Sequence, residues 1–313
     1  MSKELKPTRP TEKSWDKIKI IAVKEFSDDI TSKRLWILLA VLLLFFIGGI
    51  ATIPSLLTVT VNGEEIRLPR LAQIFLGGIS SLNYIVPLMG LAIGYDAISR
   101  ERETGTLRIL LSRPIYRDYV INGKVLSAIA TLGITLFISV FLTVSIAIVT
   151  AGVTPSIDDF LRLFLFSLFT VMYALGYYSI ALLFSTLFSK SNRSLAVSIV
   201  IWIFFSLIMQ MIASFIALSR VGFPTGWSEE VQREWLEKLG KEIAEIAPYT
   251  VGLTLNFHYQ TLASSVLSKS TEQETLDVLK VFGQTLGSLI VMILVPIILI
   301  MISYIIFVRR EEK

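Results

Sequence analysis

The sequence predicts an all-α integral membrane protein with six transmembrane helices, and two observations support this fold class. Hydrophobic residues make up 53% of the 313-residue chain and charged residues only 17%, whereas soluble domains carry about 25% charged residues. Long runs also contain no Asp, Glu, Lys or Arg, such as 35–62 and 281–308. Because a helix needs about 20 apolar residues to cross the hydrocarbon core, runs of this length indicate transmembrane spans.

The first expected element is an amphipathic helix at 15–30, within a charged N-terminal segment, 1–34, that precedes the first span. Its apolar side chains share one helical face and are Trp15, Ile18, Ala22, Phe26 and Ile30. This pattern favours an interfacial helix on the inner leaflet, and contact with a cytoplasmic partner explains it equally well. A segment this polar is not expected to be a cleaved signal peptide.

Six spans are expected after this segment, in the order 35–57, 74–98, 125–150, 160–188, 194–219 and 281–308. Two of them carry a charged residue near one end. Asp96 lies four residues before Arg100, and Arg162 lies four residues after Asp158. Because i,i+4 neighbours share a helical face, each pair can be neutralised locally at the membrane interface.

The distribution of cationic residues between the loops predicts the orientation of the chain. The segments on the side of the two termini contain 20 Lys and Arg residues, against 8 on the other side. Positively charged loops tend to stay in the cytoplasm, so we expect a multi-pass protein of the cell membrane with both termini cytoplasmic. The net charge is only +4, and the clustering beside spans indicates topology rather than binding to nucleic acid.

The outer loop 220–280, between the fifth and sixth spans, is expected to be helical. Ser228 is a typical N-cap, and Pro248 is expected to end the helix that follows it. The apolar face of this helix consists of Val231, Trp235, Leu239, Ile243 and Ile246. Residues 249–268 are too short for two spans, so we expect them to lie in the outer leaflet. The capping box at 271–274 is expected to start the last helix.

Several classes of chemistry are excluded by missing residues. The chain has no cysteine and one histidine, His258, so it offers neither a disulfide nor a histidine metal cluster. Gly123-Lys124 lacks the first glycine and the hydroxyl residue of a phosphate loop, so ATP is not expected to bind through that motif. The predicted spans contain neither a histidine nor a central carboxylate. An intramembrane enzyme is therefore the weakest functional class, and we expect no catalytic residue.

The loop 99–124, between the second and third spans, carries the strongest functional signal. Mixed charges precede Gly105, which can break a helix, and Thr106, which can cap a new one. A short apolar face follows at Leu107, and Pro114 stops it. A short capped helix among charges is typical of a docking element. An ordinary interfacial loop, with its arginines reaching toward water, explains the pattern equally well.

Three ordered motifs in this loop resemble the signature of ABC-2 type permeases. They are ERETGTL at 101–107, LSRP at 111–114 and NGK at 122–124. The resemblance covers most of the chain, because the amphipathic N-terminus, the six spans and a Pro-Tyr pair before the last span also fit. The layout is similar to that of permeases for nitrous oxide reductase maturation and for drug export.

The resemblance implies an exporter subunit that is not itself an ATPase. Two permeases, expected to be identical copies, each contact one of two ATPase subunits, which bind ATP and magnesium. The loop helix then passes the movement of the ATPase to the spans. The residues implied in this coupling are Glu101, Arg102, Glu103, Gly105, Thr106, Arg113 and Pro114. Arg113 is expected to meet an acidic groove on the ATPase, and Glu103 to pair with a nearby arginine.

Two stripes of small and polar residues mark candidate pathway linings. They consist of Gly77, Ser80, Asn83, Pro87, Gly90 and Gly94 in span two, and of Ser198, Trp202, Ser206 and Gln210 in span five. Ser80 and Asn83 are candidates to face the substrate, although such a stripe also allows close helix packing in lipid. Ser206 and Gln210 are expected to face inward, because a side-chain amide is costly in hydrocarbon.

These expectations divide the chain into a cytoplasmic N-terminal segment, 1–34, and a six-span permease domain, 35–313. The predicted function is ATP-driven export, with this chain as the membrane-spanning subunit. The alternative is a membrane scaffold that relays ATPase motion to an outer partner through the loop 220–280 without transporting a substrate.

Overall fold

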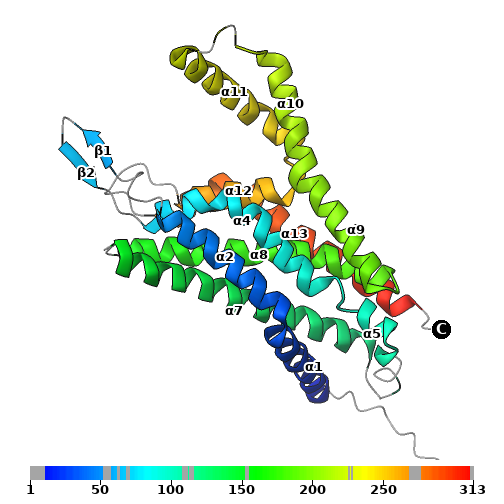
Figure 1. Ribbon diagram of the computed structural model, residues 1–313. Helices are drawn as coiled ribbons and strands as arrows, with labels where there is room; N and C mark the ends of the chain where they lie inside the picture. The colour runs from blue at the N-terminus through cyan, green and yellow to red at the C-terminus, as the bar shows by residue number, and fades with distance from the viewer. Residues whose placement is uncertain are drawn as a thin grey trace, which may run out of the picture.

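The computed structural model describes residues 11–51, 58–61, 64–67, 71–107, 112, 116–151, 155–224, 226, 228–267 and 276–310. Within these ranges the chain is almost entirely helical. Figure 1 shows long helices packed side by side in a bundle, and a pair of helices projects from one end of it.

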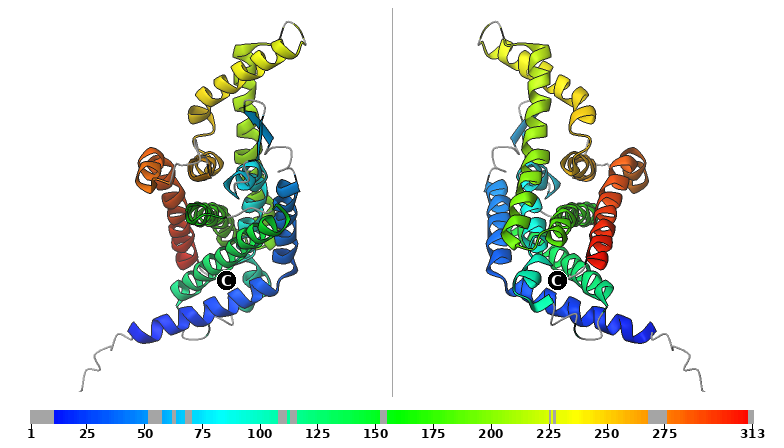
Figure 2. Two further views of the ribbon diagram at one scale, coloured as in Figure 1. Left: turned by 90° about the vertical axis from the view of Figure 1, so that its left-hand side faces the viewer. Right: turned by 90° about the vertical axis from the view of Figure 1, so that its right-hand side faces the viewer.

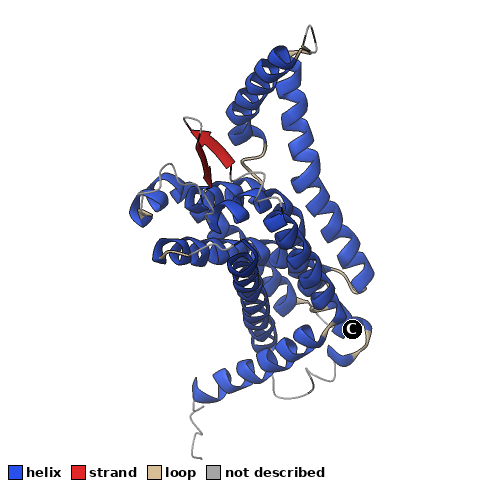
Figure 3. Cartoon of the chain, turned by 60° about the vertical axis from the view of Figure 1, so that its left-hand side comes forward, coloured by secondary structure: helices blue, strands red, loops and turns tan. Residues whose placement is uncertain are grey.

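The main helices follow one another as α1 (Thr11–Thr31), α2 (Lys33–Ala51), α4 (Leu71–Gly94), α5 (Ser99–Glu103), α7 (Arg117–Ala151), α8 (Ile157–Leu187), α9 (Ser191–Ile203), α10 (Met209–Val221), α11 (Glu229–Thr250), α12 (Leu255–Leu267) and α13 (Val278–Arg309). A π-helical turn, η1 (Phe204–Ile208), joins α9 to α10. Two four-residue strands, β1 (Thr58–Val61) and β2 (Glu64–Arg67), pair antiparallel (Figure 3). This hairpin lies between the first two spans, where the sequence predicted no strand.

Five segments are long and apolar enough to cross a membrane, and they are Ser81–Glu103, Arg117–Thr150, Ile157–Leu187, Ser191–Val221 and Val278–Arg309. A sixth crossing is present if α1 and α2, which meet at an angle of 60°, are counted together. The predicted all-α integral membrane fold is therefore confirmed, with five to six candidate spans among the described residues.

The bundle has two distinct ends (Figure 1). One end carries α5, α1 and the last turn of α13, and we name it the α5 end. The opposite end carries α11 and the β-hairpin, and we name it the α11 end. The first and last described residues of the chain therefore lie on the same side of the bundle.

α8 is the central helix of the bundle. Of its apolar stretch 72% is buried, against 11% for Ser191–Val221, and it packs against α4, α7, α9, α12 and α13. Its approach to α4 is very close at two glycines. A Cβ atom on Gly90 would lie 2.2 Å from the carbonyl oxygen of Ala174, and one on Gly94 would lie 2.7 Å from that of Tyr178. At these two positions the small-residue stripe of α4 serves helix packing.

The π-helical turn η1 keeps one face of the α9–α10 helix buried along its length. Ser194, Ser198, Ala213 and Ala217 are all fully buried. Ser194 and Ala213 are 19 positions apart, one more than five turns at about 3.6 residues a turn. Because a π-turn takes up one additional residue, it returns the two alanines to the face of the two serines.

α1 lies obliquely across the α5 end (Figure 2). Part of its predicted apolar face packs against α7. Ala22 is buried, and Gly123 of α7 is so close that a Cβ atom there would lie 2.6 Å from Ile21 Cγ2. Ile20 and Val23, which do not fit that face, are exposed at 69% and 67%, and Trp15, at the start of the face, is exposed at 60%.

The helical outer loop is present, and its first helix is longer than predicted. Ser228 caps α11 as expected, because its hydroxyl accepts from the backbone N–H of Val231. Pro248 does not end the helix, which continues to Thr250. α11 packs on α10 to form the projecting pair (Figure 3), where Arg220 lies 2.8 Å from Glu242.

The remaining part of this loop leads into the last span. α12 has 13 residues, too few to cross a membrane, and packs against α8 and α13. The predicted capping box at 271–274 lies outside the described residues. α13 begins at Val278, and the Asp277 carboxylate accepts from the backbone N–H of Lys280 at its start.

Candidate functional site

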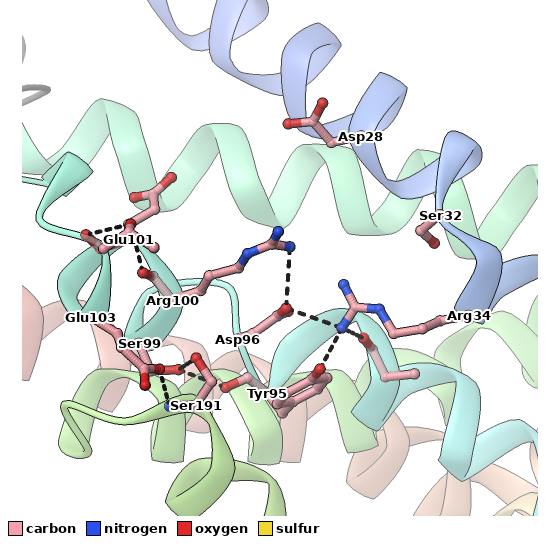
Figure 4. Close-up of polar contacts among 12 residues, drawn as sticks. Asp28, Ser32, Arg34, Tyr95, Asp96, Ser99, Arg100, Glu101, Glu103 and Ser191 are labelled. Atoms are coloured by element: carbon pink, nitrogen blue, oxygen red, sulfur yellow. Dashed lines mark hydrogen bonds and ion pairs between the residues drawn. The ribbon is translucent and has the colours of Figure 1, made fainter.

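The short helix α5 lies at the centre of the motif-bearing loop (Figure 4). The chain turns sharply after it at Gly105, whose φ is +77°, a conformation that costs little only for glycine. Thr106 does not begin a separate capped helix by the predicted contact. Its hydroxyl instead donates to the carbonyl oxygen of Glu101 at 3.3 Å, and lies 2.9 Å from the hydroxyl of Thr104. Arg113 and Pro114 lie outside the described residues, as does most of the predicted apolar face.

α5 and α8 cap one another. The hydroxyl oxygen of Ser185, near the end of α8, accepts hydrogen bonds from the backbone N–H groups of Ile98 and Ser99 at 2.8 and 2.9 Å. In return, the Arg102 guanidinium donates to the carbonyl oxygens of Thr186 and Phe188 at 3.2 and 3.0 Å. The first contact satisfies free donors at a helix start, and the second places a cation at the negative end of a helix dipole.

Lys124 of α7 joins α5 to α1. Its side chain is only 3% exposed, and its Nζ atom lies 2.8 Å from Glu101 Oε1 and 2.9 Å from Glu25 Oε2. A buried ammonium group requires such partners, because an unpaired charge inside a protein is very unfavourable. The first and last motifs of the loop, ERETGTL and NGK, are therefore linked by a buried ion pair, and α1 is held by the same lysine.

Glu103 holds the start of α9. Its exposed carboxylate accepts from the backbone N–H of Ser191 at 3.1 Å, where a negative charge is favourable at the positive end of the helix dipole. The expected arginine partner is thus replaced by a helix N-terminus. Together, the three charged residues of the ERE triplet, 101–103, contact α7, α8 and α9 in turn.

Asp96 connects the end of α4 to the start of α2. The predicted i,i+4 partner Arg100 is present at 3.8 Å, but Arg34 is closer, at 3.0 Å. The same Arg34 guanidinium donates to the hydroxyl of Tyr95 at 2.7 Å (Figure 4). The sequence predicted the local pair and could not predict the partner from α2.

The candidate pathway residues differ in their burial. Asn83 is buried against α8, where the hydroxyl of Tyr173 lies 3.0 Å from its main-chain carbonyl oxygen. Ser206, on η1, is also buried, and its hydroxyl lies 3.1 Å from that of Tyr177. Gln210 is exposed on the surface of the single chain, and the side chain of Ser80 lies outside the described residues.

One amide joins the two buried candidates into a cluster. Oδ1 of Asn256, on α12, accepts hydrogen bonds from Tyr173 and from Tyr177, the latter at 3.2 Å. This cluster of Tyr173, Tyr177 and Asn256 was not predicted. Local sequence patterns relate residues only a few positions apart, and the asparagine is about 80 positions from the tyrosines.

A comparison with protein families decides the class of this protein. A family model described as ABC-2 family transporter protein matches residues 19–311, from α1 to the end of α13. The chain belongs to the ABC-2 transporter family. A comparison with curated proteins finds no match.

Membership of the ABC-2 family makes the chain a multi-pass membrane permease and implies association with an ABC ATPase subunit. Permeases of this family are the membrane component of a transporter and are typically not catalytic themselves. The described residues contain no cluster of three or more His, Asp or Glu residues that could hold a metal ion. In this ABC-2 permease the short helix α5 contacts α7, α8 and α9 through paired charges and caps.

Proposed function

We propose that this ABC-2 permease is the membrane-spanning subunit of an ATP-driven exporter. Two copies assemble with two separate ATPase subunits, which bind ATP and magnesium. The α5 end faces the cytoplasm and the substrate moves toward the α11 end of a cell membrane. Family membership supports the transporter class, and the 20 cationic residues beside the spans on the α5 side, against 8 on the other, support the orientation.

The observation that carries this proposal is the reciprocal capping of α5 and α8. It divides the motif between two tasks. Glu101 and Arg102 face into the permease and fix α5, whereas Glu103, Thr104 and Thr106 are exposed at the surface. We therefore assign ATPase docking to the segment 101–114, with the exposed side chains as its contact surface and the inward charges as its anchors.

The translocation pathway is proposed to run between two copies of the permease. Ser80, Asn83, Ser206 and Gln210 remain the candidates to line it. Gln210 supports a contact between copies, because it is exposed on the least buried span of the single chain, and an amide facing lipid would have no hydrogen-bond partner. Asn83 and Ser206 would become accessible only if α12 and its Asn256 moved away.

The division into an N-terminal segment, 1–34, and a permease domain, 35–313, follows the same proposal. The loop 99–124 acts in coupling, and the loop 220–280 lies outside the membrane. A second function, relay of ATPase motion to an outer partner without transport, is favoured by one feature. The paired helices α10 and α11 project from the α11 end (Figure 1), where such a partner would bind.

The proposal is tested by purifying the chain in lipid nanodiscs, alone and together with a candidate ABC ATPase subunit. ATP hydrolysis should require both proteins and should rise when transported compounds are added. Hydrolysis by the permease alone would contradict the assignment. ATPase activity that no compound stimulates, together with a stable complex between the projecting helices and a third protein, would favour the relay function instead.

A further inference from the structure

α8 is bonded to α12 at three levels near the α11 end. At the first, the Arg162 guanidinium donates to the carbonyl oxygen of Val266 at 2.7 Å. At the second, the hydroxyls of Thr170 and Tyr259 lie 3.1 Å apart. At the third, the Asn256 amide accepts from the tyrosines already described. These contacts cover most of the length of α12, so α12 is fixed to α8 along its axis.

Packing strengthens the same contact between α8 and α12. The rings of Tyr173 and Tyr259 stack with their centroids 4.4 Å apart and an angle of 3° between their planes. Both tyrosines are fully buried. Leu255 lies so close to Gly176 that a Cβ atom on that glycine would be 2.7 Å from Leu255 Cδ1. Close packing of this kind cannot slide without losing contacts, so a displacement of α8 would move α12 with it.

The opposite end of α8 is bonded to α5, as described above, and the helix between is continuous. α8 has 31 residues, which corresponds to about 46 Å at 1.5 Å a residue, and its sequence contains no proline. α4 and α13 contain Pro87 and Pro296, and the α9–α10 helix contains a π-turn. Helices bend most readily at such positions. α8, like α7 with its 35 residues and no proline, therefore forms a stiff connection between the two ends.

We infer that α8 acts as a rigid connecting element that carries movement of α5 to α12, with Arg102 as the positioning residue at the α5 end. α12 then moves together with the part of α8 that carries Tyr173 and Tyr177, because Asn256 and Tyr259 bind it there. The inference rests on the proposed function for the source of the movement, which is ATPase docking at α5. The contacts themselves belong to the single chain and can be tested without any ATPase.

The test uses the absence of cysteine from the natural sequence. Ala263 of α12 is fully buried, and Ala263→Cys places one thiol there in an otherwise cysteine-free chain. The rate of its reaction with an uncharged maleimide, in nanodiscs, measures how often the buried face of α12 opens to solvent. Arg102→Ala should raise this rate about tenfold, because a charge-assisted contact is lost at the far end of α8. Arg102→Lys, which keeps a cation beside the same carbonyl oxygens, should recover most of the original rate.

Two controls separate transmission along α8 from general loosening. Arg100→Ala removes a charged neighbour of the same loop that pairs with Asp96, and it should leave the rate at position 263 unchanged. Ala147→Cys places a second buried thiol on α7 near the α11 end, and Arg102→Ala should not change its rate. If Arg102→Ala folds poorly, Ser185→Ala removes the other half of the reciprocal cap and should give the same pattern.

An unchanged rate at position 263 in both Arg102→Ala and Ser185→Ala would overturn the inference. An equal increase at positions 147 and 263 would overturn it as well, since the effect would then be a general loss of packing. Neither result would affect ATPase docking, which is measured with the partner present, and a failure of docking would leave the thiol rates unaltered.

Discussion

The Nζ atom of Lys124 lies 2.8 Å from Oε1 of Glu101, and this buried ion pair connects α7 to α5. The lysine has a second carboxylate partner, Glu25 of α1, at 2.9 Å. Three helices that are distant in sequence therefore meet at one buried charge. The position of α5, and with it the surface that we assign to the ATPase, depends on this charge.

Replacement of Lys124 by methionine should strongly destabilise the permease. The variant leaves Glu101 without its lysine partner and Glu25 paired only with the exposed Lys24, and removal of one partner of a buried ion pair costs about 3–5 kcal/mol. The thermal unfolding midpoint of the purified protein measures the effect. Lys241→Met is the matched control, because Lys241 is 75% exposed and pairs only with an exposed carboxylate, which is worth less than about 1 kcal/mol. Equal midpoints for the two variants would show that the buried pair contributes nothing.

Gly105→Ala and Gly133→Ala should have opposite effects on stability. A Cβ atom at either position meets no other atom within 4 Å, so backbone conformation alone decides the outcome. Gly105 has a φ of +77°, where a side chain costs about 1–2 kcal/mol. Gly133 lies inside α7, where alanine is favoured over glycine by about 0.5–1 kcal/mol. A higher unfolding midpoint for Gly105→Ala would contradict the turn at this position.

Acidification should loosen the packing of α12 through His258. Burial lowers the pKa of His258 below its ordinary value of about 6.5, and the hydrogen bond to the carbonyl oxygen of Gly252 opposes this shift only in part. The folded state therefore holds the neutral imidazole, which contacts Ser288 at 3.0 Å. Because the unfolded chain binds the proton more readily, stability is fully present above about pH 6.5 and decreases as the pH falls below it.

The unfolding midpoint of the wild-type permease should therefore be lower at pH 5.5 than at pH 7.5. His258→Gln should remove the part of this difference that belongs to the histidine. A pH dependence that is identical in the two proteins would show that His258 does not contribute to it.

The Gln210→Leu and Asn83→Leu variants should differ in their effect on folding. Gln210 is exposed on the single chain, so its replacement should leave folding intact and change substrate-stimulated ATP hydrolysis. Asn83 is buried beside Tyr173, so its replacement should lower the unfolding midpoint as well. If substrate-stimulated hydrolysis is unaltered in Gln210→Leu, Gln210 does not line the pathway and faces lipid instead.

Local sequence patterns predicted the elements of this fold better than their contacts. Runs without charge gave the spans, and Ser228 gave the start of α11. The α1 helix was predicted correctly, but its contact with α7 was not predicted. The reason is that Gly123 allows a close approach, and a glycine some 100 residues away carries no signal in the periodicity of α1.

In the candidate site, too, the residues were predicted but their contacts were not. The motif identified Glu101, Arg102 and Glu103, yet their partners Lys124, Thr186 and Ser191 are supplied by tertiary contacts over 23 to 88 positions. Ser185 caps α5 from another helix, which no local capping pattern predicts. The π-turn at η1 was also not predicted. Its effect is to keep the buried residues of α9 and α10 on one face, and this becomes apparent only when the complete α9–α10 helix is considered.

The most direct test of the central claim is photocrosslinking of the permease to its ATPase from Thr106. This residue is exposed beside α5, and a benzoylphenylalanine there should form a covalent adduct with the ATPase in the assembled complex. The same group at Ser219, exposed on α10 at the α11 end, should give none. An adduct from position 106 alone is the predicted result. Adducts that form only from exposed positions of α1, such as Lys24, with none from position 106, would contradict docking at α5.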